Sequence, residues 1–159
     1  MTDEVFAQAM LGMRKTMYRV SYGLLRQEQD RLDAVQEALA RAWEKRAALR
    51  DDRYLRTWLV RILINECHNI QRRQGRDVAL YALQHDASNS IPADADMDAH
   101  DAVLALPQAL RLPVILHYME GYSLQEIANM LRLPLGTVGT RLHRARRRLR
   151  SCLTDDEEV

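Results

Sequence analysis

Residues 121–149 read GYSLQEIANMLRLPLGTVGTRLHRARRRL, and this stretch decides the fold of the C-terminal part of the chain. It begins with a capping box, in which the Ser123 hydroxyl is expected to accept the amide of Glu126 while the Glu126 carboxylate reaches back to the Ser123 amide. Gly121 suits the left-handed end of a preceding helix. The sequence therefore predicts that a helix begins directly after Ser123.

The rest of the stretch predicts a turn and a second helix. Residues 132–134 are predicted to form the turn, with Pro134 ending the first helix. Gly136 and Thr137 are expected to open the second helix, with Thr137 as its N-cap. Ala128 is small enough for the two helices to cross closely, as in a helix-turn-helix. The predicted buried positions are Leu124, Ile127, Ala128 and Leu131 on the first helix and Val138, Leu142, Ala145 and Leu149 on the second.

The outer face of the second helix is strongly basic. Like charges three or four residues apart repel by about 0.2–0.5 kcal/mol per pair, and a polyanion removes this repulsion while counterion release adds affinity. A solvated basic face is the alternative, but the capping box, the turn and the arginines together favour DNA binding. The arginines are Arg141, Arg144, Arg146, Arg147, Arg148 and Arg150.

The composition of the 159-residue chain is that of a soluble, helix-rich protein, with 28% charged residues, six Gly and four Pro. The N-terminus lacks the basic and apolar regions of a signal peptide, and no apolar run reaches the roughly 18 residues that a membrane span needs. Cys67 and Cys152 form no metal-ligand spacing, so we expect reduced thiols, no metal and no cofactor. These features predict a cytoplasmic protein.

The net charge of +1 is unevenly distributed along the chain. Residues 1–75 carry 14 Lys and Arg against 10 Asp and Glu, and residues 76–106 carry one Arg against six Asp. Residues 107–153 carry eight Arg against two Glu, and four acidic residues follow within 154–159. Two basic blocks separated by an acidic stretch indicate two nucleic-acid-facing modules on one tether.

The hydrophobic periodicity predicts an all-α chain of two small helical domains. Apolar residues recur at helical spacing through residues 1–75 and again through 101–153, whereas residues 76–100 lose this pattern and gain Ala, Asp and Ser. We therefore predict domains over 1–75 and 101–153, joined by a flexible acidic linker over 76–100 and followed by an acidic tail over 154–159.

Within the first domain, a helix is predicted over Gly12–Arg26, a second after Gln29 and Asp30, and a third after the charged loop Arg50–Arg53, which supplies an N-terminal cap. In the second domain, Pro113 is expected to kink or restart a helix. The predicted buried stripes are Leu32, Val35, Leu39, Ala42 and Trp43 on the second helix and Leu55, Leu59, Ile62, Leu63 and Ile70 on the third.

Residues 121–149 resemble region 4 of extracytoplasmic-function (ECF) sigma factors, whose usual form is GxSxxEIAxxLxxPxGTVxxRxxRARxxL. The resemblance implies that the second helix enters the major groove of the promoter −35 element. Gly139 departs from the family pattern, which usually has Arg or Lys, and it weakens the helix by about 1 kcal/mol relative to Ala. We expect an altered or looser −35 preference. The implied contacts are Thr140, His143 and Arg144 with bases, Arg141 and Arg147 with phosphates, and Thr137 beside them.

Residues 33–43, DAVQEALARAW, resemble the signature D-L-V-Q-E-x-F-x-x-A-W of sigma region 2.2. Asp33 and Glu37 are like charges one helical turn apart, so a basic partner would relieve their repulsion. In the family that partner is the clamp helices of the RNA polymerase β′ subunit. The resemblance therefore implies a polymerase-binding face, with a solvated acidic face as the alternative. Its residues are Asp33, Gln36, Glu37 and Arg41.

Residues 54–73 resemble the pattern F-R-x-W-L-x-R-I-x-x-N-x-x-x-D/N-x-x-R-R of regions 2.3 and 2.4. Aromatic, amide and Arg side chains on one helix face suit single-stranded DNA, because stacking contributes about 1–3 kcal/mol per base. The resemblance implies that this face and the loop before it, residues 47–53, capture unpaired −10 bases. For Trp58 and Asn65 a place in the core is the alternative. The implied contacts are Tyr54, Trp58, Arg61, Asn65, Asn69, Arg72 and Arg73.

On these motifs the chain is identified as a member of the ECF sigma factors, within the sigma-70 superfamily. Membership implies a transcription initiation factor and not an enzyme, one that binds core RNA polymerase at the β′ clamp helices and the β flap. It implies recognition of −10 and −35 elements, melting of promoter DNA and control of a stress or envelope-response regulon. It also implies an anti-sigma factor, often membrane-anchored, a monomeric free state, and a linker that threads toward the polymerase active-site and RNA-exit channels.

Two other function classes fit parts of the sequence. A helix-turn-helix regulator that acts without core polymerase would bind operators tightly by itself, but it leaves the acidic face around Asp33 unexplained. An enzyme that uses Cys67 and His68 is disfavoured, because adjacent residues diverge by about 100° around a helix and make a poor nucleophile–base pair.

Overall fold

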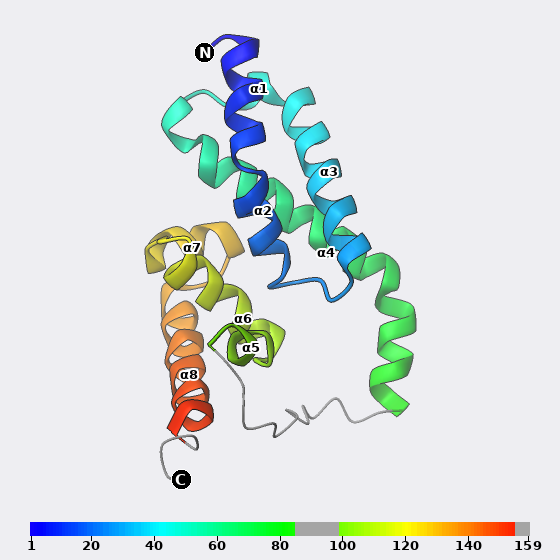
Figure 1. Cartoon of the computed structure of the whole chain (residues 1–159), viewed down its shortest axis with the longest axis vertical. Helices are drawn as coiled ribbons and strands as arrows, with labels where there is room; N and C mark the ends of the chain where they lie inside the picture. The colour runs from blue at the N-terminus through cyan, green and yellow to red at the C-terminus, as the bar shows by residue number, and fades with distance from the viewer. Residues whose placement is uncertain (85–98, 155–159) are drawn as a thin grey trace. The chain divides into compact units, whose positions relative to one another are not determined.

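The structure, a computed structural model, describes the backbone of residues 1–84 and 99–154 and the side chains of residues 1–75 and 101–152. Every element in these ranges is a helix or a helical turn (Figure 1), as the sequence predicted. The chain divides into two compact units, Met1–Tyr81 and Ala82–Val159. Among the described residues, no helix is both long and apolar enough to cross a membrane.

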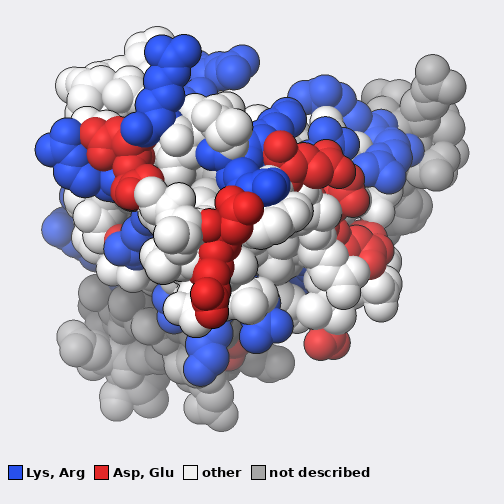
Figure 2. Space-filling view, turned by 90° about the horizontal axis from the view of Figure 1, so that it is seen from above, with Lys and Arg blue, Asp and Glu red and all other residues white. Residues whose placement is uncertain are grey.

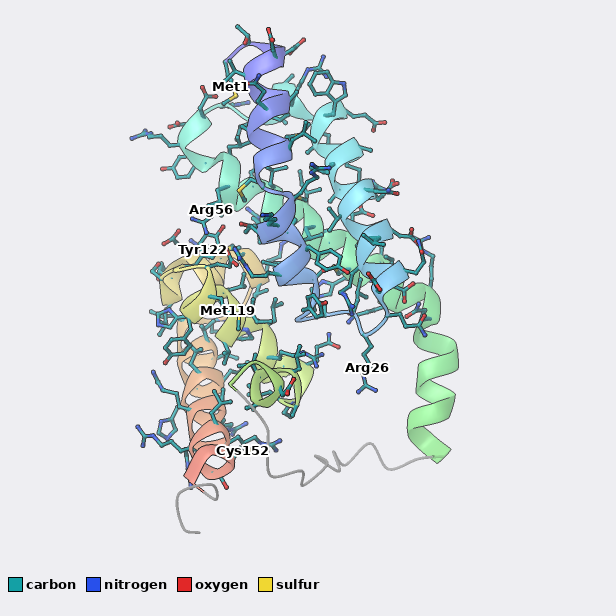
Figure 3. All side chains as sticks on the ribbon, viewed as in Figure 1. Met1, Arg26, Arg56, Met119, Tyr122 and Cys152 are labelled. Atoms are coloured by element: carbon teal, nitrogen blue, oxygen red, sulfur yellow. The ribbon has the colours of Figure 1, made fainter. Side chains whose placement is uncertain are left out.

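The first unit begins with α1, a helix that lies within the helical pattern predicted for residues 1–75 but whose bounds were not predicted. Helix α1 precedes the segment expected to be helical from Gly12, and Thr2 caps it by accepting the Val5 amide at 3.3 Å. Met1 precedes α1, and Arg26 lies in the connection between α2 and α3 (Figure 3). The described elements of this unit are α1 (Asp3–Gly12), α2 (Arg14–Ser21), α3 (Glu28–Glu44), the 3₁₀ turns η1 (Arg46–Ala48) and η2 (Asp52–Tyr54), and α4 (Leu55–Gln84).

The prediction of one helix over Gly12–Arg26 was therefore wrong. The chain breaks at Met13, α2 begins at Arg14, and α2 ends at Ser21, after which a series of turns leads to α3. The loop cap was predicted correctly, since the Asp51 side chain accepts the Arg53 amide at 3.0 Å.

The buried face of α3 differs from the predicted stripe. Ala34, Ala38 and Ala42 are fully buried, whereas Leu32 and Trp43 keep 42% and 37% of their surface exposed. The prediction that Leu32 and Trp43 are core residues was wrong. Val35 and Ala42 are buried as predicted, and Leu39 is half-buried. Alanines four residues apart form a low ridge that lets neighbouring helices approach closely, and this ridge faces the interior together with Val35.

Helix α4 runs further than predicted. The linker prediction was wrong for residues 76–84, which continue α4 to Gln84. No Gly or Pro lies between Gly75 and Pro92, and the Ala and Leu of this segment are good helix formers. The remaining linker residues 85–98 and the tail after Thr154 lie outside the described residues. Of the stripe predicted on α4, Leu55, Leu59 and Leu63 are buried, and Ile62 and Ile70 are half-buried.

The second unit accommodates Pro113 without restarting a helix. Pro113 lies buried inside α6, and the following turn η3 is π-helical, with the Glu120 amide donating to the Ile115 carbonyl at 3.1 Å. Met119 and Tyr122 flank the connection to α7, and Cys152 lies near the end of α8 (Figure 3). The described elements are α5 (Ala99–Leu104), α6 (Gln108–Val114), η3 (Ile115–Met119), α7 (Leu124–Leu131) and α8 (Leu135–Thr154).

Helices α7 and α8 form the predicted helix-turn-helix. Both halves of the capping box are present: Ser123 Oγ accepts the Glu126 amide at 3.1 Å, and Glu126 Oε1 accepts the Ser123 amide at 3.2 Å. Gly121 has the predicted left-handed conformation, with φ of 76°. The predicted buried positions Ile127, Ala128, Val138, Leu142 and Ala145 are buried, and Leu124, Leu131 and Leu149 are half-buried.

The predicted turn over residues 132–134 is present: α7 ends at Leu131, and Arg132 follows it in a left-handed conformation with φ of 55°. One detail was predicted wrongly. Thr137 is not an N-cap, because α8 already begins at Leu135 and the Thr137 amide donates to the Pro134 carbonyl at 3.0 Å. Proline lacks an amide hydrogen and has a fixed φ, so it suits the start of a helix as well as its end.

Candidate functional site

The outer face of α8 carries the residues predicted to contact the −35 element. The side of the helix with Val138, Leu142 and Ala145 is buried, so the opposite side is free to meet a partner. Thr140, His143, Arg144 and Arg147 are exposed there, and Thr137 and Arg141 are half-buried at its edge. An open hollow of about 540 Å³ is lined by Pro134, Gly136, Thr137, Thr140, Arg141 and Arg144.

The arginines of α8 do not all face one way. Arg146 donates to Tyr118 Oη at 2.9 Å, and at about 100° per residue it lies about 200° around the helix from Arg144. Thr140 Oγ1 donates to the Gly136 carbonyl at 2.9 Å, so its oxygen remains an acceptor. A Cβ added to Gly139 would meet no atom within 4 Å. The face around Arg144 is thus the open, basic one.

A groove between α3 and α4 carries the predicted polymerase-binding residues Asp33, Gln36 and Glu37, all exposed. It encloses about 720 Å³, and four of its lining side chains are carboxylates against one arginine. Figure 2 shows a face on which acidic and basic side chains are interspersed. The lining residues that the sequence did not single out are Asp30, Ala40, Glu66, Ile70 and Gln74.

Arg41, the fourth predicted polymerase contact, is half-buried and pairs with two carboxylates. Its Nε is 3.4 Å from Glu37 Oε1 and also pairs with Glu66 Oε1. The Glu66 side chain is only 3% exposed, so Arg41 compensates a buried carboxylate that joins α3 to α4. A glutamate in the apolar run of α4, directly before Cys67, was the signal in the sequence for such a partner.

A strip along α4 brings together most of the residues predicted to contact −10 bases. Tyr54 is 60% exposed at the start of the strip. Trp58 is half-buried, with its ring centroid 6.1 Å from that of Phe6, so part of the ring belongs to the core. Arg61, Asn65 and Arg72 are exposed, and Asn69 is half-buried.

Arg73 is separated from this strip. At about 100° per residue it lies a quarter turn or more from Arg72, and it lines the acidic groove with Asp33 and Glu37. Its surroundings therefore favour a role in the groove over a contact with −10 bases.

Cys67 and His68 are unsuited to covalent catalysis. Burial, with a smaller contribution from Glu66, raises the pKa of the Cys67 thiol to about 12, which removes the reactive thiolate at neutral pH. Burial and the Arg72 charge lower the pKa of His68. Within the described side chains, no three His, Cys, Asp or Glu residues are arranged to hold a metal ion.

Two family models match the chain, sigma-70 region 2 over residues 12–77 and sigma-70, region 4 over residues 96–149. Over 96% of its length the chain is 30% identical to the ECF RNA polymerase sigma factor SigW of Bacillus subtilis (strain 168), and the match covers 91% of that relative. The chain belongs to the ECF sigma factors. Sigma factors are transcription initiation factors and not enzymes, as the motifs predicted.

This sigma factor is also 30% identical, over 72% of its length, to the ECF RNA polymerase sigma-E factor of Escherichia coli (strain K12), of which the match covers 69%. Its fold matches that of the sigma factor RpoE in complex with the anti-sigma factor NepR from Bartonella quintana, with a TM-score of 0.78, 28% identity and coverage of 96% and 99% of the two chains. CnrH in complex with the cytosolic domain of CnrY has the same fold at 24% identity, with a TM-score of 0.68 and coverage of 98% and 91%.

Proposed function

We propose that this sigma factor binds core RNA polymerase through the groove between α3 and α4. Asp33, Gln36 and Glu37 are exposed there and attract a basic partner helix, for which the β′ clamp helices are the expected source. Asp33 and Glu37 are like charges one turn apart, and a basic partner relieves the repulsion between them. Arg41 already pairs with Glu37 and with Glu66, and so holds both carboxylates in place.

The two DNA-reading surfaces lie on different units. Arg144, with Thr140 and His143, reads the −35 bases in the major groove, where a bidentate Arg–guanine contact discriminates by about 1–3 kcal/mol. Tyr54, Asn65 and Arg72 on the α4 strip hold unpaired −10 bases, and stacking and backbone contacts there offset the cost of unstacking them. The observation that carries the proposal is that an acidic groove and a strip of aromatic, amide and Arg side chains lie on one unit, and a basic helix face on the other.

The decisive experiment is transcription in vitro with purified core polymerase, with and without the full chain, on a library of genomic promoters. We expect promoter-directed transcripts only when both are present, and co-purification of the chain with β′. If the free chain instead binds duplex DNA tightly, and core polymerase adds nothing, the chain is a regulator of the ordinary helix-turn-helix class and the proposal fails.

Single substitutions distinguish the proposed polymerase-binding groove from the proposed −35-binding face of α8. Asp33→Ala and Glu37→Ala are expected to weaken core binding and leave DNA contacts intact, with the exposed Glu44→Ala on the same helix as the control. Arg144→Ala is expected to lose −35-dependent transcription and to keep core binding. The expected loss of binding free energy for −35 DNA is about 1–3 kcal/mol. Arg146→Ala is its control, because Arg146 is tied to Tyr118 on another side of α8. The same defect in both groups would point to misfolding.

An anti-sigma factor is the proposed antagonist of both surfaces. One structural neighbour is the sigma factor RpoE in complex with the anti-sigma factor NepR. A protein that covers the acidic groove would exclude core polymerase by occupancy alone. We place this sigma factor in the cytoplasm with the polymerase and expect the free chain to be a monomer. We propose that its anti-sigma factor is anchored in the membrane. Gel filtration of the free chain tests the monomer, and competition for core polymerase tests the antagonist.

A further inference from the structure

Helix α1 lies outside the part of the chain that matches sigma-70 region 2, which begins at residue 12. Its inner face nevertheless belongs to the core of the first unit. Phe6 and Met10 are 4% and 6% exposed, and α1 runs alongside the segment that joins α3 to α4 (Figure 1). The residues packed with them include Ala42, Leu55 and Leu59, and Leu49 of the joining loop.

Phe6 contacts both tryptophans of the chain. Its ring centroid lies 6.2 Å from that of Trp43, at the end of α3, and 6.1 Å from that of Trp58, in the first turn of α4. The sequence contains two tryptophans in all. Because Trp43 and Trp58 stand before and after the loop of residues 46–54, one side chain of α1 fixes both ends of that loop.

A polar contact ties the beginning of the loop to α1. Arg46 Nε lies 3.0 Å from Asp3 Oδ1, and Arg46 Nη1 donates to the Trp43 carbonyl at 2.7 Å. The guanidinium carbon also lies 4.1 Å from the centroid of the Trp43 ring. The Asp3 carboxylate is 70% exposed, and exposed ion pairs add little to folding stability. The contact therefore serves to place the loop more than to hold the fold.

The second half of the loop is ordered by its own side chains. Asp51 accepts both the backbone amide of Arg53 at 3.0 Å and its guanidinium at 2.8 Å. The Arg53 guanidinium in turn lies 6.0 Å from the Tyr54 ring, which faces solvent. The Asp51 side chain therefore caps η2 and orders the residues that lead from the anchored end of the loop to Tyr54.

We propose that α1 positions the loop of residues 46–54 and Trp58 for the capture of unpaired −10 bases, with Phe6 and Asp3 as its positioning residues. The inference rests on the proposed −10 contacts and adds to them a helix that touches no DNA. Its ligand is the single-stranded −10 segment, which the loop and the α4 strip meet in the arrangement that α1 sets.

The test compares Phe6→Leu and Asp3→Asn with Gln8→Ala and Glu4→Gln in the full chain with core polymerase. Glu4→Gln is the matched control, because it removes the same charge from the first turn of α1. Promoter opening is followed with a fluorescent base in the −10 element, alongside affinity for core polymerase. The interaction energy of one aromatic pair corresponds to a change of about 2- to 10-fold in an equilibrium constant. We therefore expect Phe6→Leu to slow promoter opening by about 3- to 10-fold. For Asp3→Asn we expect about 2- to 3-fold.

Core affinity should stay within about twofold for all four variants, since their residues lie outside the groove. Exchange of the charges in Asp3→Arg with Arg46→Asp should recover part of the opening rate that Asp3→Asn loses. Tryptophan emission and its quenching by −10 single strands should change with Phe6→Leu, because both fluorophores contact that ring. This readout does not depend on transcription.

Two results would overturn the inference alone: opening rates for Phe6→Leu and Asp3→Asn that equal those of their controls, or losses in core affinity as large as the losses in opening. The first shows that α1 does not position the loop, and the second that it only stabilises the unit. If the unaltered chain opens no promoter with core polymerase, the proposed function fails and the inference fails with it.

Discussion

At the scale of single residues, Arg41 bridges two carboxylates that differ greatly in exposure. Glu37 is 54% exposed, whereas Glu66 is 3% exposed and has left bulk water. A buried carboxylate without a cation is costly. The sequence predicts Arg41 as a polymerase contact, and its two ion pairs lead us to expect a structural role as the cation that compensates Glu66.

Arg41→Ala is expected to lower the free energy of unfolding by about 1–3 kcal/mol, because it leaves the Glu66 charge without its partner. Arg41→Lys keeps the charge and should cost less. Glu37→Gln removes the exposed partner and should cost about 0–1 kcal/mol. Urea denaturation of the full chain measures all three. Equal stabilities, together with a selective loss of core binding in Arg41→Ala, would instead make Arg41 a direct polymerase contact.

Cys67 gives a prediction about thiol reactivity and pH. With its pKa raised to about 12 from an ordinary 9.0, the folded thiol stays protonated where the unfolded thiol ionises. The stability that this difference contributes is complete below pH 9 and is lost as the pH rises toward 12. At pH 8 a thiol reagent should label Cys152, which is half-buried, quickly, and Cys67 only on unfolding. The stability advantage of the wild type over Cys67→Ala should shrink above pH 9. Rapid labelling of both thiols at pH 8 would contradict the burial of Cys67.

Sequence reasoning finds residues whose exposure follows from helical periodicity. Asp33, Glu37 and Arg144 are exposed as predicted, since each lies opposite small apolar side chains on a single helix. Glu66 and Phe6 could not be found in this way. Their roles depend on which side chains a second helix brings against them, and periodicity within one helix carries no such information.

At the scale of elements, Gly139 is a weak position in the recognition helix α8. An added Cβ would meet no atom within 4 Å, and Gly in a helix interior costs about 1 kcal/mol relative to Ala. Gly139→Ala should therefore raise the stability of the second unit by about 1 kcal/mol, measured by thermal unfolding of the full chain. Affinity for a −35 duplex should not fall. A loss of affinity with normal stability would mean that the glycine lets the backbone approach DNA closely.

Element boundaries were predictable where a local signal marks them. The Ser123 capping box and Gly121 fix the start of α7, and both are present as predicted. The end of α7 is set by Arg132 in a left-handed conformation, which few non-glycine residues adopt. The inner face of α3 is set by close helix packing over Ala34 and Ala38, which outweighs the hydrophobicity of Leu32. Neither the left-handed conformation of Arg132 nor the packing over Ala34 and Ala38 has a signature in the local sequence.

At the scale of the whole molecule, the two units have separate cores and should unfold separately. Leu63 and Leu142 are 0% and 1% exposed, one in each unit. Replacement of a buried leucine by alanine costs about 2–5 kcal/mol. In calorimetry of the full chain, Leu63→Ala should lower one transition and Leu142→Ala the other. If either variant lowers both transitions equally, the units are coupled and the free chain is one cooperative body.

The contact of α1 with the loop of residues 46–54 bears on how promoter preference diverges between duplicated genes. If α1 positions the loop as proposed, a substitution at Phe6 or Asp3 reshapes the loop while every proposed DNA contact residue stays the same. Paralogues that share Tyr54 and Asn65 would then drift toward different −10 sequences through their N-terminal helices. A comparison of base-contacting residues alone would then assign such proteins the same promoters although their −10 preferences differ.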